Sequence, residues 1–246
     1  MNILILGYGN VGRRLCAELG ALAPDVYDKY NQSHNRITAP RHDVAFICVD
    51  TPRTEESDCD VSAIMDCLSS HEAEIYVIKS TVLPGTTEML ARRFGKRIVF
   101  SPEYYGYTQH ALNAGAGFTV LGGEKADCVK VQQVLQNCYD ASHRFRITDS
   151  KTAELAKYME NAWLATKVSF CHEFFDVAER IGVDYEDLRE IFVMDPRVNP
   201  SHTFVYRDHP YWSSHCLDKD VPAIMNAYDM ELLRGVFLFN EKRKPE

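Results

Sequence analysis

The clearest chemical signal in the chain is a glycine-rich turn near its N-terminus. The segment Gly7-Tyr8-Gly9-Asn10-Val11-Gly12 directly follows the apolar run Asn2–Leu6 and opens a segment with helical spacing. In such a strand–turn–helix the first glycine makes the tight turn, the second lets a pyrophosphate approach the backbone, and the third lets helix and strand pack closely. Free N–H groups at the helix start then face the phosphates. The pattern predicts a dinucleotide site that includes Gly7, Gly9, Asn10, Val11 and Gly12.

An acidic residue supports this prediction and helps to identify the dinucleotide. Asp28 ends the second apolar run, about twenty residues after Gly7, where a carboxylate bonds the ribose hydroxyls and repels a 2′-phosphate. Lys29, the next residue, argues in the opposite direction. On balance the sequence favours NAD over NADP as the cofactor.

A cysteine and two residues of a predicted helix could act on a carbonyl group. Cys216 stands directly before a predicted helix whose early Pro222 suits a first turn, and N–H groups at a helix start can stabilise a thiolate. A thiolate can trap an aldehyde, although a cysteine taken alone is more often a small buried residue. Lys157 and Asn161 have i, i+4 spacing and therefore share one helix face, as a common site requires.

The elements that must position these residues are those of an α/β protein. Short apolar runs stand at Asn2–Leu6, Val26–Asp28, Asp43–Val49, Glu74–Lys79, Arg97–Phe100 and Phe118–Leu121, and helix-length segments separate most of them. We expect a last strand at Arg144–Ile147. This alternation predicts parallel strands joined by crossovers, and hence a doubly wound sheet. The link between Asp28 and Asp43 is polar and lacks a helical period, so we expect an irregular loop there.

From Ser150 onward the pattern is helical. Apolar residues at helical spacing predict one long helix that runs to about Arg180 and is closed by Gly182. We expect a shorter helix at Tyr185–Phe192, an irregular stretch at Asp195–His215 and a last helix from about Asp218 to Phe239. The expected fold is therefore a Rossmann dinucleotide-binding domain at residues 1–148 followed by a smaller all-helical domain, built on the long helix, at residues 149–246.

The composition limits the class of protein. With 27 Lys+Arg against 35 Asp+Glu the net charge of the 246 residues is −8, which argues against binding nucleic acid or an anionic membrane through bulk charge. No stretch approaches the roughly 18 uninterrupted apolar residues of a membrane span. Eight irregularly spaced cysteines and the lack of an export signal predict reduced thiols in a cytoplasmic protein. No paired ligand spacing indicates a metal, so no metal site is expected.

Polar segments follow the third, fourth and fifth predicted strands, at the edge where open parallel sheets bind ligands. Together with two later segments they resemble, in order, the motifs of the UDP-glucose/GDP-mannose dehydrogenase family. The matching segments are Val49-Asp50-Thr51-Pro52, Lys79-Ser80-Thr81-Val82-Leu83-Pro84-Gly85-Thr86-Thr87, Ser101-Pro102-Glu103-Tyr104, Ala153-Glu154-Leu155-Ala156-Lys157-Tyr158-Met159-Glu160-Asn161-Ala162 and Cys216-Leu217-Asp218-Lys219-Asp220. Because they extend over nearly the whole chain, the resemblance is specific.

The resemblance implies an NAD-dependent enzyme that oxidises the primary alcohol of a nucleotide sugar to the carboxylate by two hydride transfers. Cys216 would hold the aldehyde as a thiohemiacetal and then as a thioester. The resemblance assigns oxygen polarisation to Lys157 and Asn161, thioester hydrolysis to Glu103, and water activation to Asp220 with Thr81 nearby. It further implies a cytoplasmic homodimer of polysaccharide biosynthesis, and cofactor contacts at Thr51, Ser80, Thr81, Glu103 and Lys219.

The chain departs from the family pattern in ways that leave the substrate open. It ends where members of the family continue into a UDP-binding domain, so we expect a short form, either truncated or naturally minimal. Tyr211-Trp212-Ser213-Ser214-His215 replaces a glycine-rich loop before the cysteine, and its bulky residues should narrow or reshape the sugar pocket. His172 stands where an asparagine is expected, and Arg197 matches an arginine that in relatives reaches the partner's substrate.

Two other functions remain open. The first is a single-hydride, hydroxyacid-type NAD-dependent dehydrogenase, which uses the same lysine and asparagine and needs no cysteine. The second is an NAD-binding regulatory or partner protein whose substrate site has decayed. The presence of six chemically coupled residues argues against decay: Thr81, Glu103, Lys157, Asn161, Cys216 and Asp220.

Overall fold

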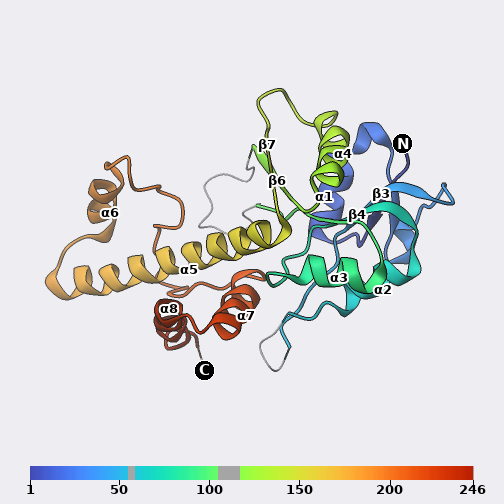
Figure 1. Cartoon of the computed structure of the whole chain (residues 1–246). Coiled ribbons are helices and arrows are strands. Elements are labelled where there is room, and N and C mark those ends of the chain that lie inside the picture. The colour runs from blue at the N-terminus through green and yellow to red at the C-terminus, as the bar shows by residue number, and fades with distance from the viewer. Residues whose placement is uncertain (55–58, 105–116, 246) are drawn as a thin grey trace. The chain divides into compact units, whose positions relative to one another are not determined.

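The computed structural model describes residues 1–54, 59–104 and 117–245 of the chain (Figure 1). These residues divide into two compact units. The described residues up to Lys157 form the first, here called the sheet unit, and those from Tyr158 onward form the second, the helical unit. Each unit is described by itself.

The sheet unit is built on seven strands in the order β2-β1-β3-β4-β5-β6-β7. Their bounds are β1 Ile3–Leu6, β2 Asp25–Tyr27, β3 His42–Ile47, β4 Ala73–Ile78, β5 Ile98–Phe100, β6 Phe118–Gly122 and β7 Arg144–Thr148. All neighbours are parallel except β5 and β6, which pair antiparallel through Phe100 and Gly122. The predicted α/β fold with a doubly wound sheet is therefore confirmed, with one antiparallel pair that the sequence did not indicate.

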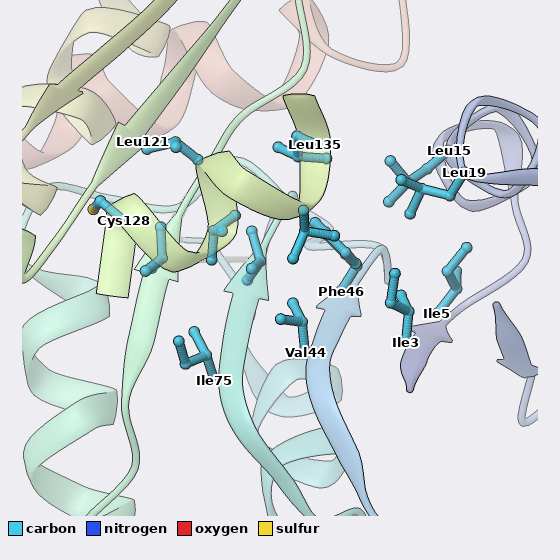
Figure 2. Close-up of a cluster of buried hydrophobic side chains, with 14 of the residues drawn as sticks. Ile3, Ile5, Leu15, Leu19, Val44, Phe46, Ile75, Leu121, Cys128 and Leu135 are labelled. Atoms are coloured by element: carbon cyan, nitrogen blue, oxygen red, sulfur yellow. The ribbon is translucent and has the colours of Figure 1, made fainter. Parts of the chain in front are cut away.

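Alternation of side chains along the strands divides the core of the sheet unit into two layers. On one face, Ile3, Ile5, Val44 and Phe46 form a cluster with residues of α1 (Asn10–Glu18) and α4 (Lys125–Gln136), as Figure 2 shows. On the other face the intervening strand residues form a second cluster with residues of α2 (Ser62–Ser70) and α3 (Thr86–Phe94). Helices on both faces are what a doubly wound sheet requires, because each face is apolar.

The strand order places a topological switch point at β1. The neighbours of β1 are β2 on one side and β3 on the other, so the connections that leave these strands diverge above their carboxyl ends. The link from β2 to β3 contains only a 3-10 turn at Gln32–His34 and an antiparallel bridge between Val26 and Arg36. It is the irregular loop that its polar sequence predicts.

The helical unit contains most of α5 (Ser150–Ile181), together with α6 (Tyr185–Val193), α7 (Leu217–Tyr228) and α8 (Glu231–Glu241). The long helix α5 ends at Gly182, whose φ of +73° closes it as expected. At the start of α6 the Asp184 carboxylate accepts hydrogen bonds from the N–H groups of Glu186 and Asp187. Among all the residues that the structure describes, in both units, no helix is long and apolar enough to cross a membrane.

The prediction of a single last helix from Asp218 to Phe239 is wrong, because the structure has two helices there. Asp229 adopts the left-handed conformation with φ 46°, and Met230 is extended, so α7 and α8 are separate. Neither residue is a glycine or proline, which is why the sequence carries no strong break signal there. Pro222 is also misplaced by the prediction: it lies inside α7 rather than in its first turn, where its missing N–H costs a helix hydrogen bond.

A buried, hydrogen-bonded pair, Asp25 and His42, holds the start of the β2–β3 region. The Asp25 carboxylate lies 2.9 Å from His42 Nε2, and it accepts further bonds from the N–H and hydroxyl of Thr38 and the N–H of Ala39. Burial alone would raise the pKa of Asp25, but the hydrogen bonds from His42, Ala39 and Thr38 outweigh it and lower this pKa to about 2. The carboxylate is therefore more stable ionised in the folded chain than in water.

We predict that Asp25→Asn lowers the free energy of unfolding at pH 7 by about 2 kcal/mol, the equivalent of this pKa shift. The sign follows from the lowered folded pKa: the stabilisation is complete above the unfolded pKa of about 4 and is lost as the pH falls toward 2. The variant should lack this part of the acid dependence. Urea unfolding at pH 7 and pH 3 measures both effects, with the exposed Asp208→Asn as control; an unfolding free energy unchanged at pH 7 contradicts the prediction.

Candidate active site

The predicted glycine turn has the close contacts that its spacing requires. Gly7 has φ +92°, and a Cβ on it would lie 2.8 Å from the Cys48 carbonyl oxygen at the end of β3. A Cβ on Gly12 would lie 2.0 Å from the carbonyl oxygen of Gly7, so the turn and the first turn of α1 can approach only without side chains there. Gly9, directly before Asn10 and Val11 of α1, has open space around it. The open position and the helix start together suit an approaching phosphate.

Asp28 is held at the edge of this turn by backbone N–H groups. One carboxylate oxygen accepts from Tyr8 N at 2.7 Å, and the other accepts from Tyr30 N at 2.9 Å and Asn31 N at 2.8 Å. Burial alone would raise the pKa of Asp28, but these bonds outweigh it and lower the pKa. The carboxylate is thus ionised and fixed in direction, and its oxygens retain capacity to accept hydroxyl donors.

The loops after β3 and β4 are joined at the carboxyl edge of the sheet. Thr51 Oγ1 donates to the Thr81 carbonyl oxygen at 2.9 Å, and Ser80 Oγ donates to the Val49 carbonyl oxygen at 2.5 Å. The structure therefore brings together three predicted cofactor residues, Thr51, Ser80 and Thr81.

Glu103 is bound to a lysine whose role the sequence did not reveal. Lys79, the last residue before Ser80, is buried, and its Nζ lies 2.5 Å from Glu103 Oε1 and 3.2 Å from Ser101 Oγ. The ion pair fixes the Glu103 carboxylate at the end of β5. Lys79 opens one of the segments that match the family, and it is a cation directly at the end of an apolar strand, where burial requires a charged or polar partner.

Lys157 lies in the same unit, at the part of α5 that belongs to the sheet unit. It is buried, and its Nζ is 4.8 Å from the centroid of the Tyr104 ring, the residue after Glu103. An ammonium over an aromatic face is stabilised by the ring quadrupole. Both Lys157 and Glu103 are thus positioned at the segment that follows β5.

Glu154 is a further residue whose contacts the sequence analysis did not predict. Its side chain is fully buried and accepts from Gly85 N at 2.6 Å and Thr87 N at 2.8 Å, at the start of α3. Burial raises the pKa of Glu154 even though these bonds oppose the rise. The carboxylate ties α5 to the end of the loop that carries Ser80 and Thr81. A charged residue on the buried face of a predicted helix, three residues before Lys157, is a signal that could have found it.

Four predicted residues gather at the start of α7 in the helical unit. Asn161 Nδ2 donates to Asp220 Oδ2 at 2.7 Å, and Lys219 Nζ lies 2.6 Å from the other oxygen of Asp220. Asn161 and Asp220 are buried. Cys216 immediately precedes α7, its side chain is exposed, and its carbonyl oxygen accepts from Asp220 N at 2.8 Å. The thiol therefore lies at the N-terminal end of a helix, as expected.

The loop before Cys216 is anchored inside the helical unit. Trp212 is buried, its indole N–H donates to Ser169 Oγ at 3.1 Å, and its backbone exchanges hydrogen bonds of 2.8 and 3.0 Å with the Asn240 side chain. Trp212 therefore packs in the interior of the helical unit. The expectation that this loop narrows or reshapes a sugar pocket stays a prediction. A loop residue can contribute to a core when distant partners satisfy its N–H groups, and the local sequence does not show those partners.

The remaining candidates are also placed by the structure. His172 is buried in α5, and Arg197 is an exposed residue whose guanidinium binds Asp195 at 3.0 and 3.1 Å. Among the described residues no group of three or more histidine, cysteine and acidic side chains is arranged to hold a metal. The predicted site residues thus fall into two groups, one in each unit, with Lys157 in the sheet unit and Asn161 one helical turn later in the helical unit.

We predict that Gly12→Ala weakens NADH binding by more than about tenfold, because the added Cβ would displace the Gly7 carbonyl and the helix start that faces the phosphates. Gly9→Ala should leave the melting temperature unchanged, since its Cβ meets no atom within 4 Å, yet weaken binding if the pyrophosphate approaches there. NADH fluorescence titration and thermal melting distinguish these effects. Gly20→Ala, also in open space, is the control, and wild-type affinity in Gly12→Ala would refute the role of this turn.

Comparison with known proteins gives the family. Residues 28–141 match the NAD binding domain of the UDP-glucose/GDP-mannose dehydrogenase family, and residues 151–242 match its central domain. Among similar proteins, UDP-glucose 6-dehydrogenase of Pseudomonas aeruginosa is 31% identical over 232 residues, which cover 82% of this chain and 49% of that protein. The UDP-N-acetyl-D-mannosamine dehydrogenase of Methanocaldococcus jannaschii is 26% identical over 190 residues, covering 72% of this chain and 43% of that protein. The chain spans about half the length of the curated relatives it matches.

Solved structures show the same fold. A UDP-glucose dehydrogenase from Pyrobaculum islandicum superposes with a TM-score of 0.80 at 22% identity, covering 98% of this chain and 68% of that chain. A 3-hydroxyisobutyrate dehydrogenase from Mycobacterium tuberculosis superposes with a TM-score of 0.70 at 18% identity, covering 98% of this chain and 92% of that one. These likenesses concern the fold alone. The family models confirm both the resemblance and the NAD cofactor expected from the sequence: the chain belongs to the UDP-glucose/GDP-mannose dehydrogenase family and contains that family's NAD-binding domain.

Proposed function

We propose that the protein oxidises the primary alcohol of a nucleotide-linked sugar to the carboxylate, by two hydride transfers that pass through Cys216. The observation that carries this proposal is the set of side chains around the start of α7. There Lys219 and the buried Asp220 follow Cys216 in the first turn of α7, and Asn161 of α5 donates to the Asp220 carboxylate. A merely structural helix start does not need a buried amide, carboxylate and ammonium next to an exposed thiol.

The residues of the sheet unit fit the cofactor that the family implies. Only glycine fits at Gly7 and Gly12, Gly9 is open, and the ionised Asp28 can accept the ribose hydroxyls. We propose that Asn10, Val11, Thr51, Ser80, Thr81, Glu103 and Lys219 complete the cofactor contacts. When bound there, NAD supplies the acceptor for each hydride.

The reaction needs a nucleophile that holds the aldehyde between the two hydride transfers. In our proposal the Cys216 thiolate adds to the aldehyde carbon and forms a thiohemiacetal. Loss of the second hydride leaves a thioester, and water cleaves its C–S bond to release the carboxylate and regenerate the thiol. The balance is one alcohol, two NAD⁺ and one water giving one carboxylate, two NADH and three protons.

The other residues supply charge and proton transfer in this scheme. We assign polarisation of the substrate oxygen to the Lys157 ammonium and the Asn161 amide, which Asp220 holds in one orientation. Glu103, positioned by Lys79, is proposed to act in hydrolysis of the thioester, and Asp220 in activating the water, with Thr81 close to that water.

We predict two molecules of NADH per sugar at limiting substrate and excess NAD⁺, because the thioester route removes two hydrides. Cys216→Ala should reduce turnover to carboxylate by about 1,000-fold or more while keeping NADH binding, since the exposed Cys216 side chain is not among the proposed cofactor contacts. NADH absorbance is followed with UDP-glucose, GDP-mannose, their amino-sugar relatives and nucleotide-free sugars, with Cys138→Ala as a matched thiol control.

The stoichiometry separates the proposal from its alternatives. One NADH per substrate in the wild-type chain would identify a single-hydride, hydroxyacid-type dehydrogenase and reject the cysteine route. NADH binding without turnover of any of these sugars would favour a regulatory or partner protein instead.

We further propose that the protein is a homodimer that pairs through α5. Apolar residues on the helical-unit part of α5 form one exposed stripe at helical spacing: Met159, Trp163, Phe170, Phe174, Val177 and Ile181. Met159 and Trp163 remain 74% and 59% exposed. A contiguous apolar stripe of this length marks an interaction surface, and a second copy of the same helix offers the matching apolar surface.

On the family resemblance we also propose that the enzyme acts in the cytoplasm in polysaccharide biosynthesis.

We predict that Trp163→Glu converts this dimer into a monomer, because the charge would have to be buried against the partner's stripe. Light scattering after size-exclusion chromatography gives the mass directly. Leu232→Glu, which replaces a side chain of α8 that is 78% exposed, serves as control and should leave the mass unchanged. A wild-type mass of 28.1 kDa, that of a single chain, would reject the dimer.

A further inference from the structure

The loop after β2 places an acidic and a basic residue side by side, and their charges favour different cofactors. In dinucleotide-binding folds a carboxylate at the end of the second strand bonds the ribose hydroxyls of NAD, whereas a cation close to it accommodates the 2′-phosphate of NADP. Asp28 and Lys29 occupy these neighbouring positions here. Asp28 alone therefore does not explain why a 2′-phosphate should be rejected.

The structure gives the two side chains different partners. The Asp28 carboxylate is fixed by the three N–H groups of Tyr8, Tyr30 and Asn31, which keep it charged at the edge of the glycine turn. Lys29 instead extends to α2, where its Nζ lies 2.9 Å from Asp66 Oδ2. Both side chains of this ion pair are about half exposed, so the ammonium, carried by the residue directly after Asp28, remains in solvent.

Asp66 changes the electrostatic balance at this edge. The side chains of Asp28, Lys29 and Asp66 together carry a net charge of −1. If Asp66 were neutral, the charges of Asp28 and Lys29 would cancel and the Lys29 ammonium would lose its carboxylate partner. The Arg36 guanidinium keeps its charge but donates to the Pro24 carbonyl oxygen at 2.8 Å, so it is held by a partner of its own and Lys29 is the cation directly next to Asp28 in the chain. Exposed charges such as these act on a bound phosphate over a Debye length of about 8 Å at physiological ionic strength.

We propose that Asp66 is a specificity-determining residue, which excludes 2′-phosphorylated dinucleotides by engaging the Lys29 ammonium. In this arrangement Asp28 selects for the free ribose hydroxyls, and Asp66 removes the competing attraction of Lys29 for a 2′-phosphate. Asp66 itself need not touch the cofactor. Its effect on NADPH must therefore pass through Lys29.

Fluorescence titration of NADH and NADPH against the full chain tests this inference. Asp66→Asn should tighten NADPH binding by roughly three- to tenfold and change NADH binding by less than about twofold, because only the former carries the extra phosphate. The gain should fall as salt is raised. In the Lys29→Met background the same substitution should give little or no gain, since the ammonium that it releases is absent.

Glu72→Gln removes another carboxylate of the sheet unit, one that pairs with Lys96, and should leave both affinities unchanged. Asp66→Asn should also leave the melting temperature nearly unchanged, because exposed ion pairs add little stability. The inference is overturned if wild-type protein binds NADPH as tightly as NADH, if Asp66→Asn leaves their ratio unchanged, or if the gain persists in full with Lys29→Met. All these readouts concern cofactor binding, so they are separate from the proposed sugar oxidation.

Discussion

The parallel backbone register of the sheet is the constraint on which the dinucleotide region depends. Leu6 pairs with Ile47, Ile47 with Ile78, and Ile78 with Phe100, so four strands end at the same level. The residue that follows each of β3, β4 and β5 continues the backbone hydrogen bonding between the strands. The N–H groups of Cys48, Lys79 and Ser101 donate to the carbonyl oxygens of Leu6, Ile47 and Ile78, respectively. Segments that are far apart in sequence are thereby brought into one row. Slipping one strand by a single residue would turn its side chains to the opposite face.

The sheet register brings the backbone segments together, and hydrogen bonds between buried polar groups then fix the directions of the candidate site's side chains. Lys79 with Glu103, Glu154 with two N–H groups of α3, and Asn161 with Asp220 each satisfy a group that burial would otherwise penalise. Such pairs define direction as well as charge, because a satisfied hydrogen bond is lost when the side chain rotates. Rigid placement of charge is what stabilises a developing oxyanion without reorganisation.

The strands, the glycine turn and the long helix could be predicted because their signals are local. Apolar runs mark strands, and the spacing around Gly7 fixes a turn before any partner is known. The break between α7 and α8 could not be predicted, because apolar residues keep a helical period on both sides of Asp229. The left-handed backbone conformation of Asp229 alone ends α7. The burial of Trp212 depends on Ser169 and Asn240, which lie 43 and 28 residues away. The ion pair between Lys79 and Glu103 likewise depends on strand order, which spacing alone does not give.

The irregular link between β2 and β3 has a consequence for the solubility of the sheet. β2 has β1 on one side only, so its outer backbone would offer unpaired N–H and carbonyl groups to a strand of another molecule. The link prevents this at Val26, whose N–H and carbonyl oxygen are both taken up by Arg36 at 2.9 and 2.8 Å. β2 is also only three residues long. A short edge strand whose central residue is already paired is a poor template for edge-to-edge aggregation, so this polar loop protects the sheet without adding a helix or a further strand.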